Sequence, residues 1–199
     1  MASITTEMVK QLREKTGAGM MDCKKALEET GGDSDKAIEY LRKKGAATAA
    51  KRADKETNQG VVEAYIHAGG RIGSMVEVNC ETDFVAKTPE FKQLAHDIAM
   101  QIAAMSPNYI SREQISKETI DKELEIYKSQ AANEGKPANI AEKIAQGRLD
   151  KFYQEVVLME QSFIKDSGKT IKDLIDEQTA KVGEKISIRR FHRYHLGEA

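Results

Sequence analysis

Apolar residues in the first 45 positions recur at helical spacing in three short runs. The runs are Met8, Val9 and Leu12; Met21, Ala26 and Leu27; and Ala37, Ile38 and Leu41. Thr5 or Thr6 can cap the first helix, Asp33 or Ser34 can cap the third, and glycines follow all three runs. We predict three helices that end at Gly17, Gly31-Gly32 and Gly45, then an alanine-rich connecting helix over 46–53 and a linker over 55–60. The predicted domains are therefore 1–54 and 55–199.

From Val61 the hydrophobic period changes to two, which is typical of strands. Val62, Ala64 and Ile66 alternate with other residues, as do Ile72, Ser74, Val76 and Val78 after Ala68-Gly69-Gly70. This pattern predicts a β-hairpin. A third alternating run covers 186–196, so a long-range pairing must complete a three-stranded antiparallel sheet. The fold class is predicted to be α+β.

Two further helical regions lie between these strands. Thr88-Pro89 precedes an amphipathic run of Phe91, Leu94, Ala95, Ile98, Ile102 and Met105, which Ser106-Pro107 ends. Residues 116–157 form two thin apolar stripes around Gly135-Lys136-Pro137, a pattern that predicts an antiparallel helical hairpin. A projecting arm and a packed helix pair explain this hairpin equally well. Thr170 and Asp173 resemble a capping box before one more helix.

Two places in the chain could offer apolar side chains to a partner. Thr82-Asp83-Phe84-Val85-Ala86-Lys87 lies between the second predicted strand and the long helix, so Phe84 would leave a short turn in a fixed direction. Because aromatic side chains are usually buried, these residues alone favour a Phe84 that covers the end of a core. Met20 and Met21 are adjacent at a helix start and cannot both face its core, so one exposed methionine and two packed ones are equal alternatives.

Composition and motif content argue against several classes of function. The 199 residues include 31 basic and 32 acidic side chains, and the net charge of −1 argues against general nucleic-acid binding. Cys23 and Cys80 have no metal-binding spacing, and His192 and His195 would point to opposite faces of a strand. We expect no metal, no cofactor and no enzymatic activity, since phosphate-loop and nucleophile motifs are absent from the sequence. No stretch resembles a signal peptide or a membrane span, which favours a cytoplasmic protein with no membrane partner.

Three stretches resemble signatures of one protein family. Leu12–Leu27, with Thr-Gly-Ala-Gly-Met-Met-Asp at its centre, resembles the N-terminal signature of bacterial translation elongation factor Ts. Glu77–Lys87 resembles the second signature, and Gly135-Lys136-Pro137 with the residues up to Arg148 resembles the helical-hairpin region. The stretches occur in the family's order, and the resemblance covers essentially the whole chain.

The resemblance implies a guanine-nucleotide exchange factor that is not itself an enzyme. Family members bind the GTPase elongation factor Tu, stabilise its nucleotide-free state and so promote GDP release, without binding nucleotide themselves. It also implies that the N-terminal helices form a ubiquitin-associated-like domain.

The resemblance further implies which residues contact the GTPase. The phenylalanine at the Phe84 position wedges between helices of the GTPase, Asp83 supports that contact, and Thr82 and Val85 complete the Thr-Asp-Phe-Val signature. Two further contacts with the GTPase are implied. Some residues contact it near the side of its site that binds the guanine base, and a histidine contacts it in the second copy of the core that longer members have. These are Arg13, Met20, Met21 and His67.

This chain differs from the longer members, which repeat the sheet-containing core. Here Tyr65–Gly73 resembles the opening of the second copy but runs directly into the signature of the first. A single-core chain could restore the missing surface by pairing, so we predict a homodimer through the exposed sheet face or edge. Two other readings are an adaptor that binds through the three helices alone and an RNA- or ribosome-binding protein that uses Arg189–Arg193.

Overall fold

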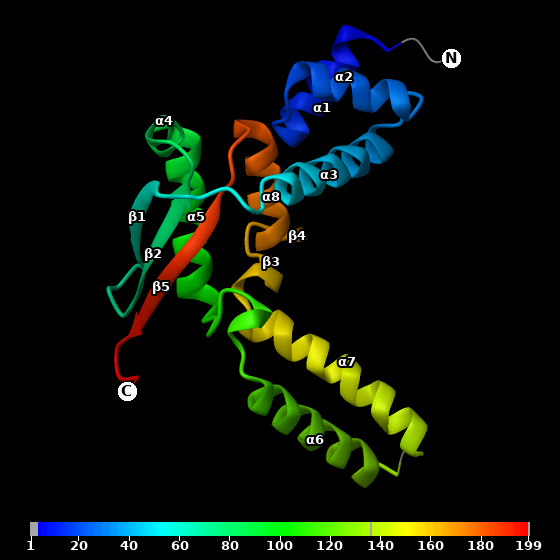
Figure 1. Cartoon of the computed structure of the whole chain (residues 1–199), viewed down its shortest axis with the longest axis vertical. Coiled ribbons are helices and arrows are strands. Elements are labelled where there is room, and N and C mark those ends of the chain that lie inside the picture. Colours follow the sequence, from blue (N-terminus) through cyan, green and yellow to red (C-terminus); the bar gives the residue numbers. More distant parts are fainter. Residues whose placement is uncertain (1–3, 136, 199) are drawn as a thin grey trace. The chain divides into compact units, whose positions relative to one another are not determined.

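The structure is a computed structural model that describes residues 4–135 and 137–198. It is an α+β fold with a three-stranded sheet, as predicted (Figure 1). The chain forms two compact units. One contains the described residues up to Glu63 with Val76–Ala95 and Lys172–Arg189, and the other contains Ala64–Met75, His96–Ile171 and the described residues from Arg190. The boundary at 54/55 stays a prediction.

Three N-terminal helices pack around a core of their own. They are α1 (Thr6–Thr16), α2 (Met20–Glu29) and α3 (Ser34–Lys51). Thr5 caps α1, Asp33 caps α3 and Gly17 ends α1 in the left-handed conformation, as the sequence predicts. The buried cluster is Val9, Leu12, Cys23, Ala26, Leu27 and Ala37.

The predicted end of the third helix at Gly45 is wrong. Helix α3 continues to Lys51, and Gly45 is buried within it. A Cβ at Gly45 would lie 3.5 Å from the Asp176 carbonyl oxygen and 3.7 Å from the Ala180 Cβ, so α3 packs closely on a helix from the C-terminal part of the chain. This packing offsets the cost of about 1 kcal/mol that glycine brings to a helix interior.

The three-stranded antiparallel sheet has the order β1-β2-β5. Its strands are β1 (Gln59–Ile66), β2 (Ile72–Cys80) and β5 (Ser187–His195). Figure 1 shows β2 between the other two strands, so the long-range pairing is confirmed. Gly69 and Gly70, both at positive φ, turn the chain between β1 and β2.

One face of β2 is buried and is joined to helix α5 (Pro89–Met105). Ser74, Val76, Val78 and Cys80 are buried on that face, and the Ser74 hydroxyl donates to the Ala99 carbonyl at 2.6 Å. The predicted apolar face of α5 is buried from Phe91 to Ile102. Its predicted last member, Met105, is exposed.

Residues 116–157 form two helices, α6 (Lys117–Asn133) and α7 (Ala138–Val156), which lie side by side (Figure 1). Arg148 of α7 donates to Gln130 and Glu134 of α6 at 2.8 and 2.7 Å. Buried Ile115, Leu149, Tyr153 and Val157 form a local cluster at one end of the pair. The predicted break at Gly135-Lys136-Pro137 falls at this connection, but Lys136 lies outside the described residues.

The remaining elements are short, except for α8. They are α4 (Asp83–Ala86), the 3-10 turns Arg112–Gln114 and Leu158–Glu160, the antiparallel pair β3 (Ser162–Phe163) and β4 (Asp166–Thr170), and α8 (Ile171–Val182). Helix α8 begins directly after Thr170, as its capping pattern predicts. The sequence did not predict the β3–β4 pair.

Candidate functional site

The turn that carries Phe84 is a single helical turn, α4, between β2 and α5. Thr82 is its N-cap, and the Thr82 hydroxyl accepts from the Val85 amide at 3.5 Å. Thr88 follows, and its hydroxyl accepts from the Phe91 amide at the start of α5. Capping residues on both sides thus limit α4 to one turn.

Phe84 is 80% exposed, although its neighbours Val85 and Ala86 are half-buried and buried. The expectation from the residues alone, that Phe84 covers the end of a core, is therefore wrong. The side chains that follow it in the turn make the inward contacts, so Phe84 is directed outward. An aromatic ring held outside the fold on a short, anchored turn is suited to inserting into a partner.

A charged pair flanks the aromatic ring. The Lys87 ammonium donates to the Asp83 carboxylate at 2.6 Å, one helical turn apart. This hydrogen bond lowers the pKa of Asp83. Asp83 is therefore a carboxylate at neutral pH, oriented along α4 beside Phe84.

Thr82 is fixed by a residue that the sequence reasoning missed. The Glu184 carboxylate, 102 residues away, accepts from the Thr82 hydroxyl at 2.6 Å and from the Thr82 amide at 3.0 Å. No local pattern marks Glu184, which lies between α8 and β5. Only the strand pairing that brings β5 beside β2 could have indicated it.

Met20 and Met21 are both exposed, at 44% and 75%, so they do not both pack into the three-helix core. They begin α2 after Gly19, which caps the helix without a side chain. Arg13 lies exposed in the last turn of α1, before the Gly17 turn that leads to α2. Arg13 thus lies exposed before the connection from α1 to α2, and Met20 and Met21 lie exposed after it. Methionine side chains adapt well to a partner surface.

His67 lies in the other compact unit, exposed at the turn between β1 and β2. Its Nδ1 lies 3.0 Å from the Tyr65 hydroxyl, and its amide donates to the Ile72 carbonyl at 2.8 Å. Its position at the tip of a hairpin leaves the ring accessible.

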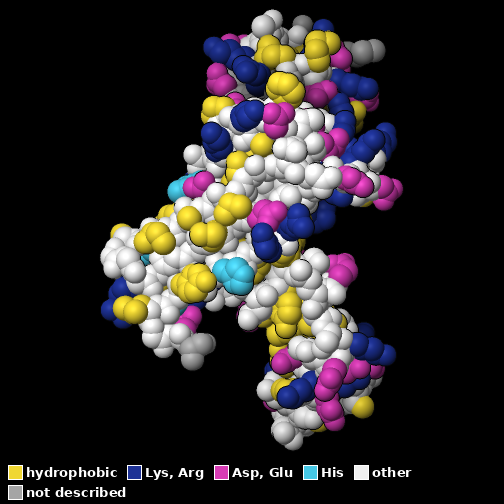
Figure 2. Space-filling view, turned by 60° about the vertical axis from the view of Figure 1, so that its left-hand side comes forward, with side chains coloured by type: hydrophobic (Ala, Val, Ile, Leu, Met, Phe, Trp, Pro, Cys, Tyr) yellow, Lys and Arg dark blue, Asp and Glu magenta, His cyan; other side chains and the backbone are white. Residues whose placement is uncertain are grey.

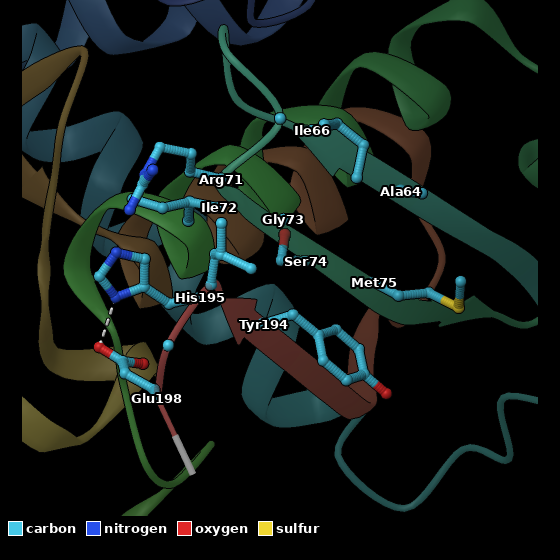
Figure 3. Close-up of a pocket in the computed structure, with 13 residues that line it drawn as sticks. Ala64, Ile66, Arg71, Ile72, Gly73, Ser74, Met75, Tyr194, His195 and Glu198 are labelled. Carbon is cyan, nitrogen blue, oxygen red and sulfur yellow. Dashed lines mark hydrogen bonds and ion pairs between the residues drawn. The ribbon is translucent and has the colours of Figure 1, made fainter.

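The same unit carries an open groove of about 570 Å³ at the ends of the three strands (Figure 3). Figure 3 shows Ile66, Met75 and Tyr194 around it, one from each strand. All three are exposed, and Leu196, also exposed, lines the same groove. Hydrophobic side chains gather over the strands in the space-filling view (Figure 2).

The rim of the groove is polar. His195 Nδ1 lies 2.6 Å from a Glu198 carboxylate oxygen, and this contact lowers the pKa of Glu198 (Figure 3). Arg193 donates to the same Glu198 side chain at 2.9 Å and to the Ala103 carbonyl at 3.1 Å. These contacts hold the residues after β5 in place beside the apolar surface.

Comparison with known proteins decides the family. A family model described as Elongation factor TS matches residues 3–198. The chain belongs to the elongation factor Ts family. It is 64% identical over 195 residues to Elongation factor Ts of Carboxydothermus hydrogenoformans, covering 98% of this chain and 90% of that protein. It is 62% identical over 198 residues to Elongation factor Ts of Desulforamulus reducens, covering 100% and 91%.

Family membership makes this chain a translation elongation factor. Elongation factor Ts of Moorella thermoacetica, 64% identical over 190 residues, covers 96% of this chain and 94% of its own length. The resemblance stated on Leu12–Leu27 and Glu77–Lys87 is thereby confirmed for the whole chain. Among the described residues, none of the helices combines the length and the apolar character that crossing a bilayer requires.

Proposed function

We propose that this chain is a guanine-nucleotide exchange factor, not an enzyme, and that it acts on the GTPase elongation factor Tu. The exposed Phe84 on α4 carries this proposal, because an outward aromatic side chain lies in the stretch Glu77–Lys87 that resembles the second signature of the family. Asp83, Thr82 and Val85 surround the wedge on the same turn.

The proposed mechanism depends on a difference in affinity. GTPases hold their nucleotide chiefly through contacts to phosphates and magnesium, so a wedge that moves the helices near those groups weakens nucleotide binding. The wedge fits only after the helices have moved, and the factor therefore binds the empty GTPase more tightly than the loaded one. Linkage makes the effect reciprocal: bound nucleotide weakens binding of the factor to the same extent.

A second contact is proposed for the N-terminal helices, which we take to be a ubiquitin-associated-like domain. Exposed Met20 and Met21 offer flexible apolar contacts, and Arg13 offers a charge beside them. The α6–α7 hairpin is proposed to be an arm, and no role in exchange is assigned to it. The protein is proposed to act in the cytoplasm, without nucleic acid, membrane or cofactor.

We also propose a homodimer through the groove at the strand ends. Ile66, Met75, Tyr194 and Leu196 leave an apolar surface exposed, which a monomeric soluble protein rarely does over a contiguous area. A second copy provides an identical apolar surface and can therefore cover it about a two-fold axis. The contact proposed for His67, at the hairpin tip of the same unit, would then be made by a dimer.

Release of fluorescent GDP from the cognate elongation factor Tu tests the exchange activity. Catalytic amounts of the wild-type chain should accelerate release, and Phe84→Ala should be at least about 30-fold less efficient if the ring is a hot spot worth about 2 kcal/mol. Ile126→Ala removes another exposed apolar side chain, on α6, and should act like the wild type. A wild-type chain that leaves GDP release unchanged would overturn the proposal.

The dimer has a separate test. Sedimentation equilibrium should give twice the chain mass for the wild type and one chain mass for Tyr194→Asp, which places a charge on the apolar surface. Ile140→Asp, at an exposed apolar position on α7, is the matched control and should stay dimeric. A monomeric wild type at micromolar concentration contradicts the proposed dimer and leaves the exchange activity untouched.

A further inference from the structure

Glu81 and Glu184 join two segments that are far apart in the sequence. One is the end of β2, just before α4, and the other lies between α8 and β5. The Glu184 carboxylate accepts from the Thr82 amide, and the Glu81 carboxylate accepts from the Lys185 amide at 2.6 Å. Each glutamate thus binds the backbone of the residue that neighbours the other glutamate. These reciprocal, charge-assisted hydrogen bonds fix the end of β2 against the segment between α8 and β5.

The Glu81 side chain is also held by a second partner, Arg52. The Arg52 guanidinium donates from one nitrogen to both Glu81 oxygens, at 2.7 and 2.9 Å. By contrast, both carboxylate oxygens of Glu184 accept hydrogen bonds from Thr82, one from its amide and one from its hydroxyl. The two glutamates therefore have different tasks: Glu81 ties strand β2 to the end of α3, and Glu184 holds the N-cap of α4.

The chemistry of Glu184 decides which way the Thr82 hydroxyl points. An ionised carboxylate can only accept hydrogen bonds, so the Thr82 hydroxyl must donate its proton to Glu184. Its lone pairs are then free to accept from the Val85 amide in the first turn of α4. The Thr82 carbonyl is held as well, since the Cys80 thiol donates to it at 3.1 Å.

The direction of Phe84 follows from the backbone that carries it. With 80% of its surface exposed, the ring has few neighbours of its own to orient it. A four-residue helix is not stable by itself, because forming a first turn is unfavourable. The hydrogen bonds to Thr82 therefore supply the order that α4 lacks.

We propose that Glu184 is a positioning residue for nucleotide exchange: its two hydrogen bonds to Thr82 hold α4 in the conformation that presents Phe84 to the GTPase. This inference rests on the proposed function. When Glu184 is removed, only a fraction of the molecules present the wedge at any time, and the apparent affinity for the GTPase falls by that fraction. Two lost hydrogen bonds predict about a tenfold lower kcat/KM for Glu184→Ala.

A double-mutant cycle separates positioning from general destabilisation. In the GDP-release assay, Glu184→Ala should be slow when Phe84 is present but should add nothing to Phe84→Ala, because it acts through that ring. Thr82→Val removes the hydroxyl that donates to Glu184 and should also slow GDP release when Phe84 is present. Glu125→Ala, at an exposed position on α6, is the matched carboxylate control and should behave like the wild type.

Glu184→Gln keeps the test decisive if Glu184→Ala does not fold. The amide retains one acceptor oxygen for Thr82 and should give a rate between those of the wild type and Phe84→Ala. Equal effects of the Glu184 substitution with and without Phe84 would overturn the inference, as would a Glu184 variant with wild-type kcat/KM. If instead the wild-type chain does not accelerate GDP release at all, the proposed function itself fails.

Discussion

Gln101 and Gln161 lie 60 residues apart and share a side-chain hydrogen bond of 3.2 Å, with the Gln101 amide nitrogen as donor. Both side chains are completely buried. The Gln161 amide nitrogen also donates to the carbonyls of Met105 and Glu155, at 3.3 and 2.7 Å. The pair thus joins the end of α5 to the segment that follows α7 through buried polar contacts.

Replacing Gln161 with alanine should lower the free energy of unfolding by about 2–4 kcal/mol, because it removes the hydrogen bonds to Gln101, Met105 and Glu155 and opens a cavity at a fully buried position. Urea unfolding followed by circular dichroism measures the change. Gln146→Ala, on the exposed face of α7, is the control and should stay within about 0.5 kcal/mol of the wild type. Equal stabilities for the two variants would show that the buried pair contributes little.

Two glycines predict opposite effects of the same substitution. A Cβ at Gly60 would lie 2.2 Å from the Val78 carbonyl oxygen, so Gly60→Ala should destabilise the protein by about 3 kcal/mol or more. Gly147 lies within α7, and a Cβ added there would meet no atom within 4 Å, so Gly147→Ala should stabilise by about 0.5–1 kcal/mol. Thermal unfolding of both variants compares the signs directly, and two shifts in one direction would contradict this account.

Glu81 makes the stability sensitive to acid. The hydrogen bond from the Lys185 amide, followed by the contacts with Arg52, lowers the pKa of Glu81 below its ordinary value of 4.5. Below about pH 4.5 the unfolded chain takes up a proton at Glu81 before the folded chain does. The contribution of Glu81 is therefore fully present above that pH and is lost as the pH falls through the lower, folded value.

The glutamine in Glu81→Gln does not ionise. The difference in free energy of unfolding between this variant and the wild type should therefore shrink as the pH falls. Urea unfolding of both proteins from about pH 7 to about pH 3.5 covers the window. A difference that stays constant across that range would mean that Glu81 titrates alike in the folded and unfolded chains.

Both cysteines should resist thiol reagents in the folded protein. Cys23 and Cys80 are completely buried, and burial raises both pKa values, that of Cys80 to about 11. At pH 8 only about a thousandth of Cys80 is then thiolate, the form that reacts. Reaction with Ellman's reagent should be slow in buffer and fast in urea, and Cys80→Ser identifies which thiol remains. Rapid labelling in buffer that disappears in Cys80→Ser would show that the end of β2 opens readily.

The regular elements were predictable where a period repeats over several turns or alternations. Helix α5 and the β1–β2 hairpin are examples, since their patterns are long and their ends carry strong signals at Pro89 and Gly69-Gly70. The continuation of α3 through Gly45 was not predictable, because the packing that offsets the glycine comes from Asp176 and Ala180, far along the chain. The β3–β4 pair was missed because β3 spans only two residues and β4 is largely polar.

The candidate site shows the same division. Local sequence indicated that Phe84 follows a strand and precedes a helix, but burial statistics for aromatic residues favoured the wrong environment. Family resemblance, not the local pattern, indicated an exposed wedge. Glu184 had no signal at all, because a carboxylate that binds a residue 102 positions away leaves no periodicity in either segment.

The long separation of Thr82 and Glu184 has a consequence for how the protein is made. At about 5–20 residues per second, synthesis reaches Glu184 about 5–20 s after Thr82. Until the growing chain includes Glu184, the turn that carries Phe84 lacks the hydrogen bonds that anchor Thr82 in the folded protein. A partial product that stops before α8 would contain Phe84 and lack the carboxylate that anchors its turn.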